Sequence, residues 1–139
     1  MPLQIRPYQT TDQSAVIALW RLVFPNPAPH NDPLLDIQRK LTVQPECLLV
    51  ADQDGSIVGT IMAGFDGHRG WVYYVAVHPE QRRQGIGQKL MSTAEQALER
   101  LGCNKINLQV RADNVSVLAF YRSLGYAVEE RISLGKRLA

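Results

Sequence analysis

The segment from His78 to Lys89, HPEQRRQGIGQK, has the residue types of an anion-binding loop. It separates an apolar run from a stretch with helical spacing. It should therefore lie where a helix begins and presents unpaired backbone N–H groups and the positive end of its dipole. Gly85 and Gly87 lack side chains that would keep a phosphate away from those amides. Positive charge nearby comes from Arg82, Arg83 and Lys89. A diphosphate fits this design better than a single carboxylate does.

Two common nucleotide-binding patterns do not match this loop. The pattern G-x-x-x-x-G-K-[ST] is absent from the chain, and the pattern G-x-G-x-x-G fails because Leu90 occupies the place of its third glycine. A purely structural interpretation stays open, in which Gly85 and Gly87 only form a tight turn between a strand and a helix.

The elements that must position this loop begin with three apolar runs, which predict strands at Leu48–Ala51, Ile57–Ala63 and Trp71–Val77. Asp54-Gly55 is a strong hairpin signal between the first two. A second turn, Asp66 to Gly70, leads into the third. Consecutive strands joined by tight turns predict an antiparallel meander.

Behind the loop, a helix and another strand are expected. Apolar residues from Ile86 to Leu101 follow helical spacing, and Gly102 is well placed to end the helix. Alternation from Ile106 to Arg111 predicts a half-buried strand. Strand, helix and strand in succession predict that the two strands run parallel.

The remaining elements lie toward the ends of the chain. Expected there are a strand at Leu3–Arg6, a helix at Thr11–Val23, a short helix capped by Asp32 and running to about Leu41, a last helix at Val115–Leu124 capped by Asn114 and closed by Gly125, and a final strand from about Tyr126. Four prolines in the segment from Phe24 to Pro33, with Pro33 included, favour an extended connection between the first two helices. Together these elements predict an α/β fold (α+β, with a mixed sheet), in which an antiparallel meander is followed by a parallel strand–helix–strand crossover.

Length and composition exclude several classes of protein. The chain has 139 residues and 15.6 kDa, so we expect one domain over residues 1–139. A net charge of +2 is small for a nucleic-acid binder, and no apolar run approaches a membrane span. The start of the chain does not have the pattern of a secretory signal, which favours a cytoplasmic protein. The two cysteines and three histidines lack metal-ligand spacing, so no metal site is predicted.

Two motifs, in the expected order along the chain, resemble those of the GNAT superfamily of N-acetyltransferases. Arg82-x-x-Gly85-x-Gly87, after a strand that ends Val75-Ala76-Val77-His78-Pro79, is similar to its acyl-CoA signature. Asn114, then Tyr121 and Leu124-Gly125-Tyr126, resembles its second motif. The likeness spans most of the chain from Cys47 onward. A narrower likeness, to the small bacterial YpeA-like branch, is found in Asn31–Pro33, Gly64–Gly70 and Ser133–Leu138.

The resemblance implies acetyl-CoA as acyl donor and direct attack of an acceptor amine on the thioester, without an acyl-enzyme. Pantetheine would lie along Val75, Ala76 and Val77. The residues implied at the diphosphate are Arg82, Arg83, Gln84, Gly85, Ile86, Gly87, Gln88 and Lys89. A strand N–H near Val75 would stabilise the charge that develops on the carbonyl oxygen. Tyr121 would donate a proton or a hydrogen bond to the departing thiolate, and Asn114 would contact the cofactor.

Several points stay open at this level. The general base is Asp66, His68, Glu80 or Asp113, or a water relay replaces it. The segment from Phe24 to Asp32 borders the acceptor or is only a connector, and only one of Tyr73 and Tyr74 can line an acceptor channel. Trp20 and Trp71 line the channel or fill the core, and the core is the favoured place for both.

The acceptor is a small molecule or a protein amine, and the sequence does not decide whether the chain forms a homodimer. The alternative function is a non-catalytic acyl-CoA-binding or sensing module of the same fold.

Overall fold

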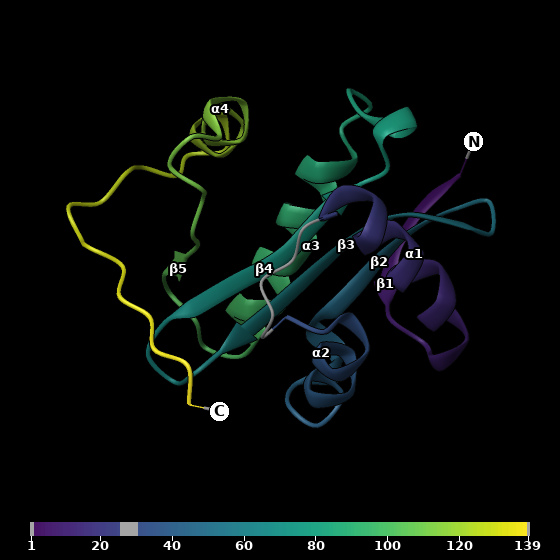
Figure 1. Cartoon of the computed structure of the whole chain (residues 1–139), viewed down its shortest axis with the longest axis horizontal. Helices are drawn as coiled ribbons and strands as arrows, with labels where there is room; N and C mark the ends of the chain where they lie inside the picture. The colour runs from purple at the N-terminus through teal and green to yellow at the C-terminus, as the bar shows by residue number, and fades with distance from the viewer. Residues whose placement is uncertain (1, 26–30, 139) are drawn as a thin grey trace. The chain divides into compact units, whose positions relative to one another are not determined.

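The computed structural model describes residues 2–25 and 31–138 of the chain (Figure 1). Its elements are β1 (Leu3–Pro7), η1 (Thr10–Asp12), α1 (Gln13–Val23), α2 (Pro33–Lys40), η2 (Pro45–Cys47), β2 (Leu48–Gln53), β3 (Ser56–Phe65), β4 (Gly70–Val77), η3 (Pro79–Gln81), α3 (Ile86–Arg100), β5 (Ile106–Asn107) and α4 (Val115–Ser123). The chain divides into two compact units, Met1–Leu108 and Gln109–Ala139, and each is described by itself.

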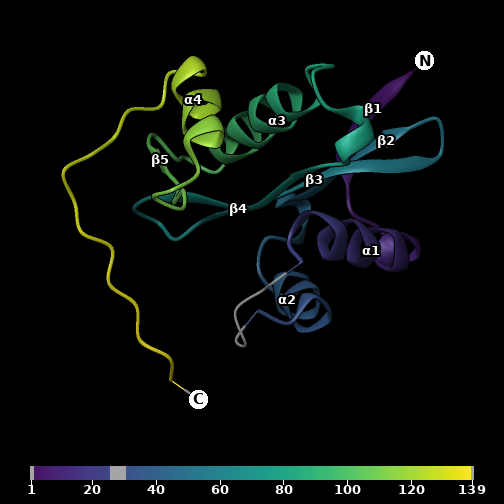
Figure 2. The same ribbon diagram turned by 45° about the horizontal axis from the view of Figure 1, so that its top comes forward.

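The first unit is a five-stranded mixed sheet covered on both faces. The strand order is β1-β2-β3-β4-β5; the first four strands are antiparallel, and β5 is parallel to β4. Helices α1 and α2 lie on one face of this sheet and α3 lies on the other (Figure 2). This architecture confirms the predicted meander followed by a parallel strand–helix–strand unit.

The predicted hairpin between β2 and β3 has the geometry that its sequence requires. Asp54 and Gly55 have φ of 57° and 93°, and both central residues of a type I′ turn need positive φ. The Gly55 N–H donates to Asp52 Oδ1 at 2.8 Å. The turn sets the register of Gln53 and Asp52 against β3, and a shift between Asp52 and Ala51 then sets it for the buried residues Leu48–Ala51.

Two predicted strands differ from the structure. The ladder between β4 and β5 holds only Gly70 opposite Ile106 and Trp71 opposite Asn107, so the strand expected to reach Arg111 ends at Asn107. Alternation of apolar residues indicates an extended chain. A strand also needs a neighbouring strand to pair with its backbone N–H and C=O groups. The final strand expected from Tyr126 is also wrong. Among the described residues 126–138 there is no helix or strand, and from residue 127 on the side chains are exposed.

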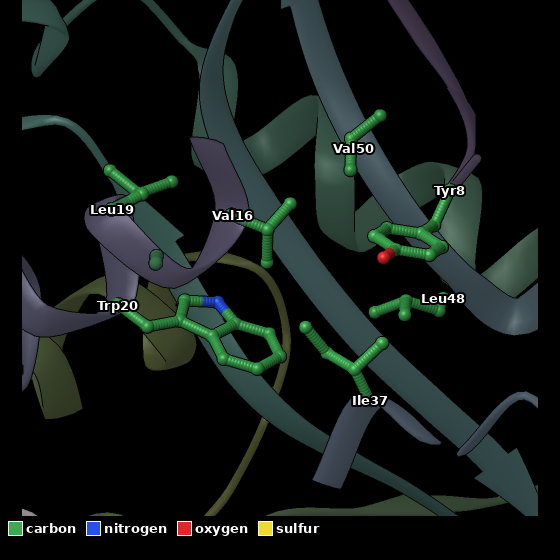
Figure 3. Close-up of a cluster of buried hydrophobic side chains, with 8 residues drawn as sticks. Tyr8, Val16, Leu19, Trp20, Ile37, Leu48 and Val50 are labelled. Carbon is green, nitrogen blue, oxygen red and sulfur yellow. The ribbon is translucent and has the colours of Figure 1, made fainter. Parts of the chain in front are cut away.

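A buried cluster fills the space between the sheet and the helices α1 and α2 (Figure 3). Its members are Tyr8, Val16, Leu19, Trp20, Ile37, Leu48, Val50 and Ala76. Trp20 is 1% exposed, which confirms its predicted place in the core. On the opposite face α3 buries five members of the stripe that its helical spacing predicted, namely Ile86, Leu90, Met91, Ala94 and Leu98. The other two are not buried, since Ala97 is half-buried and Leu101 is 39% exposed.

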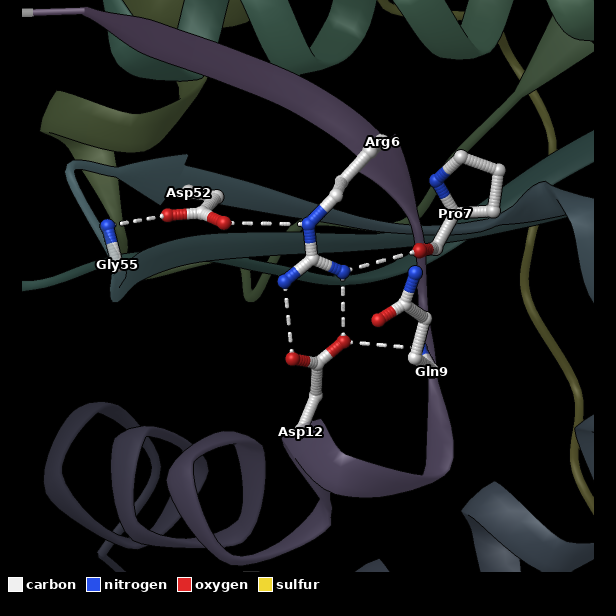
Figure 4. Close-up of polar contacts among 6 residues, drawn as sticks. All are labelled: Arg6, Pro7, Gln9, Asp12, Asp52 and Gly55. Atoms are coloured by element: carbon white, nitrogen blue, oxygen red, sulfur yellow. Dashed lines mark hydrogen bonds and ion pairs between the residues drawn. The ribbon is translucent and has the colours of Figure 1, made fainter.

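A charged network joins β1 to the start of α1 and to the β2–β3 hairpin (Figure 4). The Arg6 guanidinium donates to both oxygens of Asp12, at 2.8 and 3.0 Å, and to Asp52 Oδ2 at 3.2 Å. The Gln9 N–H donates to the same Asp12 carboxylate. Because hydrogen bonds from Arg6 favour the charged form, they lower the pKa of Asp12 against an opposing effect of burial.

We predict that Asp12→Asn lowers the free energy of unfolding at pH 7 by about 2 kcal/mol, the scale of a hydrogen-bonded charge. A carboxyl whose pKa is lowered on folding stabilises the native state above its unfolded pKa, about 3.9, and loses that contribution as the pH falls through its folded pKa. The difference between the two proteins should therefore shrink below about pH 4. Urea denaturation across pH measures it, with the exposed Asp54→Asn as control. Equal effects of both substitutions would contradict the role of the network.

Candidate functional site

The centre of the candidate site is a bulge in β4. Thr60 of β3 pairs with Ala76 and Met62 pairs with Tyr73, so Tyr74 and Val75 together lie opposite one residue of β3. Tyr74 has φ of 52°, a conformation that an aromatic L-residue adopts only where its surroundings hold it. A bulge of this kind turns the strand and changes the direction of the backbone groups that follow it.

Three elements hold Tyr74 in this conformation. Its ring stacks on that of Trp20 in α1, with centroids 3.8 Å apart and planes inclined by 12°. Its hydroxyl donates to Asp36 Oδ2 of α2 at 2.6 Å. Its carbonyl accepts from the Thr60 hydroxyl of β3 at 2.9 Å, and that hydroxyl accepts from Trp20 Nε1 at 2.8 Å. Burial, together with the Asp36 carboxylate, raises the pKa of Tyr74, so its hydroxyl remains a donor.

The edge of β4 that faces β5 pairs with no described strand from Val72 onward, and the bulge lies within this unpaired part. Because the described ladder to β5 ends at Trp71, residues 72–77 have no strand partner on that side. An edge of this kind presents backbone N–H and C=O groups to an extended ligand. Val75, Ala76 and Val77 lie on it, as the sequence-based interpretation requires of a pantetheine-binding strand.

The turn after β4 directs the chain into α3. The His78 N–H donates to the Val58 carbonyl at 2.8 Å, and the Glu80 N–H donates to His78 Nδ1 at 3.1 Å. Arg83 and Gly85 then adopt positive φ, 66° and 77°. A Cβ on Gly85 would contact nothing within 4 Å, so glycine serves its backbone conformation there rather than close packing.

Gly85 is the N-cap of α3 and has no side chain with which to cap it. The amides of Ile86, Gly87 and Gln88 in the first turn therefore have no acceptor within the helix. Lys89 differs, because its N–H donates to the Gly85 carbonyl at 3.1 Å and only its side chain is left for a ligand. Ile86 is 2% exposed and anchors the turn in the core.

The other predicted residues of this loop are exposed around these amides: Arg82, Arg83, Gln84, Gln88 and Lys89. The loop therefore combines hydrogen-bond donors, a helix dipole and positive charge in one turn. That is the combination that binds phosphate groups.

The second unit holds the other two predicted site residues. Asn114 caps α4, since its Oδ1 accepts from the Val117 N–H at 3.3 Å. The helix ends in a Schellman motif, in which Gly125 has φ of 96° and the N–H groups of Gly125 and Tyr126 donate to the carbonyls of Arg122 and Tyr121. This closure packs the ring of Tyr126 on that of Tyr121, with centroids 6.0 Å apart. Tyr121 is 7% exposed, and burial raises its pKa to about 12.

The four candidate bases named from the sequence, Asp66, His68, Glu80 and Asp113, are all exposed. Asp66 Oδ1 accepts from the N–H groups of His68 and Arg69 at 2.7 and 2.8 Å, and these bonds lower its pKa. The structure thus gives Asp66 a role in closing a turn.

The sequence analysis missed Asp36. Its contact with Tyr74 joins residues 38 positions apart, and no local pattern marks it.

A small pocket lies beside the bulge. It has a volume of about 110 Å³ and is lined by Trp20, Arg21, Phe24, Pro25, Pro33 and Tyr74. Of the two neighbouring tyrosines, Tyr74 lines this pocket, whereas Tyr73 is 51% exposed. The segment from Phe24 to Asp32 therefore contributes to a pocket through Phe24 and Pro25; its residues 26–30, His30 among them, lie outside the described residues.

Comparison with known proteins gives two results for the sequence. The model of the acetyltransferase (GNAT) family matches residues 14–126. An acetyltransferase of Yersinia enterocolitica is 46% identical over an alignment 139 positions long, and the alignment covers 98% of this chain and 96% of the relative. An acetyltransferase of Pectobacterium atrosepticum is 46% identical over 136 residues with the same coverage.

Solved structures with the same fold include the aminoglycoside N-acetyltransferase AAC(6')-Iy in complex with CoA. It has a TM-score of 0.83 and 19% identity, over 99% of this chain and 96% of that one. The ribosomal-protein-S18-alanine N-acetyltransferase of Escherichia coli has a TM-score of 0.74 and 25% identity, over 89% and 77%. The narrower likeness to the YpeA-like branch stays a prediction.

We predict that Thr60→Val destabilises the protein by about 2 kcal/mol, because it leaves the buried Trp20 indole N–H without an acceptor. The matched control is Thr93→Val in α3, whose hydroxyl donates only to the Lys89 carbonyl of its own helix. That change should stay within about 0.5 kcal/mol. Urea denaturation of both variants measures the difference, and equal destabilisation would contradict a special role for Thr60.

Proposed function

Because the chain belongs to the acetyltransferase (GNAT) family, we propose that it transfers an acetyl group from acetyl-CoA to the primary amine of a small molecule or a protein. The observation that carries this proposal is the sequence of features along β4 and α3. A bulge, an open strand edge and a phosphate-binding turn follow one another within residues 74–89. That order suits a donor with a reactive thioester at one end and a diphosphate at the other.

The diphosphate is proposed to bind the amides between Arg83 and Gln88. Support comes from the uncapped first turn of α3 and from the exposed side chains of Arg82, Arg83 and Lys89. Pantetheine is proposed to extend along Val75–Val77 as an additional strand on the open edge. Solved structures of the same fold include complexes with CoA.

The chemical step is proposed to be direct attack of the neutral amine on the thioester carbonyl. The C–N bond forms, the carbonyl oxygen gains negative charge, and the C–S bond breaks as that charge returns. An N–H at the bulge, near Val75, is proposed to donate to the oxygen while it is charged. The amine loses its proton as the amide forms, and the departing thiolate gains one.

Tyr121 is proposed to donate to that thiolate. With a pKa of about 12 its phenol stays protonated at every pH at which the protein would be assayed. A thiol has a pKa of about 8.5, so full transfer of the phenolic proton to a thiolate is uphill by about three to four pKa units. Tyr121 then acts mainly by donating a hydrogen bond that grows stronger as charge appears on sulfur. Asn114, which caps the same helix, is proposed as a second cofactor contact.

Removal of the amine proton is proposed to run through water or to precede binding. The four candidate bases are exposed to water, so none of them lies in a buried site beside the acceptor amine. Asp36 already accepts a hydrogen bond from the Tyr74 hydroxyl. An alkyl ammonium has a pKa near 10, so the reaction should accelerate as the pH rises toward that value.

Both units are proposed to act as one catalytic domain over residues 1–139, since the family match runs from residue 14 to residue 126 and crosses their boundary. Among the described residues no helix has both the length and the apolar composition to cross a membrane. A cytoplasmic location stays a prediction, and the choice between monomer and homodimer is open.

We predict that Gly85→Ala weakens acetyl-CoA binding about tenfold. A Cβ at φ of 77° is strained by about 1–2 kcal/mol, and relief of that strain would turn the first amides of α3 away from the diphosphate. Gly67→Ala is a matched control, because Gly67 also has positive φ and open space around its Cα but lies in the Asp66–Gly70 turn. Titration calorimetry with acetyl-CoA compares the two. Equal affinities would mean that the loop does not hold the cofactor.

We predict that Tyr121→Phe lowers kcat by roughly 100-fold, the scale for loss of one hydrogen-bond donor to a charge that develops in the transition state, while the Kd for CoA stays within twofold. Thiol release in the presence of an acceptor amine measures turnover. Tyr126→Phe keeps the ring that packs on Tyr121 and serves as control, with an expected change in kcat below threefold. An unchanged kcat in Tyr121→Phe would remove this residue from the mechanism.

A further inference from the structure

The pocket beside the bulge is built mainly from aromatic rings and prolines. The rings of Trp20 and Tyr74 stack, and the ring of Phe24 meets that of Tyr74 edge-on, with centroids 5.7 Å apart and planes inclined by 72°. Pro25 and Pro33 complete the apolar lining. Such walls favour an apolar ligand group, because they offer it dispersion contacts. They offer a polar group no hydrogen bonds to replace those that it makes with water.

The charge on the lining of the pocket does not suit a polycation. Among the described residues that line it, Arg21 is the one with a formal charge, and that charge is positive. The neighbouring carboxylate, Asp36, accepts from the Tyr74 hydroxyl with Oδ2, and its Oδ1 lies 3.9 Å from Arg39 Nη1. Within the part of the chain that the structure describes, only Oδ2 is therefore hydrogen-bonded, and Asp32 is a second carboxylate whose charge acts on Tyr74.

The size of the pocket limits what can enter it. A cavity of about 150 Å³ accepts a benzene molecule, and a water molecule takes about 30 Å³ of liquid volume. The pocket, with about 110 Å³, has room for one small ring or one branched alkyl group.

The position of the pocket connects it with the proposed chemistry. Tyr74 contributes its ring to the pocket, and the next residue, Val75, lies on the open edge of β4. A group held in the pocket would therefore lie next to the backbone at which the thioester is proposed to react.

We propose that this pocket selects the acceptor, which is a primary amine with one apolar group of the size of a small ring or a branched alkyl chain, in preference to a polyamine. This inference rests on the proposed acetyl transfer. Discrimination between amines with and without the apolar group should be about 10- to 100-fold, the range that apolar pockets achieve for small differences in size.

The first test measures binding without turnover. The protein is saturated with CoA and titrated in a calorimeter with 3-methylbutylamine, 2-phenylethylamine, ethanolamine and spermidine. The two apolar amines should bind at least tenfold more tightly than ethanolamine or spermidine, with a negative heat-capacity change. Equal or tighter binding of ethanolamine or spermidine would overturn the inference.

Two variants locate the binding. Phe24→Ala removes a wall and should weaken binding of 3-methylbutylamine about tenfold, with the Kd for CoA unchanged. Leu22→Ala is its matched control, because Leu22 lies two residues earlier in α1 but is 52% exposed and not part of the lining. Arg21→Glu should raise the affinity for spermidine. If Phe24→Ala binds the apolar amines as the native chain does, the pocket is not their site.

Thiol release with acetyl-CoA and the same four amines separates this inference from the proposed function. Release that is fastest with ethanolamine or spermidine would keep the acetyl transfer and overturn the pocket inference. Selective binding of the apolar amines without thiol release from any of them would keep the pocket inference as a binding preference and overturn the transfer.

Discussion

The backbone conformation of Tyr74 is the constraint on which the rest of the site depends. A bulky residue at φ of 52° costs on the order of 1–3 kcal/mol, and the surroundings must supply at least that much. They do so through a ring stack with Trp20, a hydrogen bond to Asp36 and a hydrogen bond from Thr60. These contacts come from α1, α2 and β3, so the direction of the chain after the bulge is fixed by the packing of most of the first unit.

The same residue connects the two halves of the proposed reaction. Its side chain lines the apolar pocket, while its backbone leads into the open edge of β4. A ligand that displaced the Tyr74 ring would also disturb the Thr60 hydroxyl and the Trp20 indole, because the three are joined by hydrogen bonds and stacking. The proposed recognition of the acceptor and the proposed alignment of the donor therefore depend on the same residue.

The parts of the fold with local patterns could be predicted from the sequence. The Asp54-Gly55 hairpin and the apolar stripe of α3 are examples, since each depends on residues close together in the chain. The bulge could not be predicted, because nothing within WVYYVAV marks Tyr74 and its partners are distant in sequence. The contact of Asp36 with Tyr74 could not be predicted for the same reason. The strand predicted to Arg111 was too long because alternation reports which face is apolar and not where a neighbouring strand ends.

The short ladder between β4 and β5 also sets the length of the unpaired edge of β4. Pairing stops at Trp71, and the strand then runs through residues 72–77 before the turn that leads to the exposed cationic loop. At about 3.3 Å per residue, the part of this edge from Val75, where the thioester is proposed to react, to Val77 measures about 10 Å. A donor can engage both ends only if its anionic group and its reactive group are separated by a comparable length. Selection of the donor by length would then be independent of the acyl group that the donor carries.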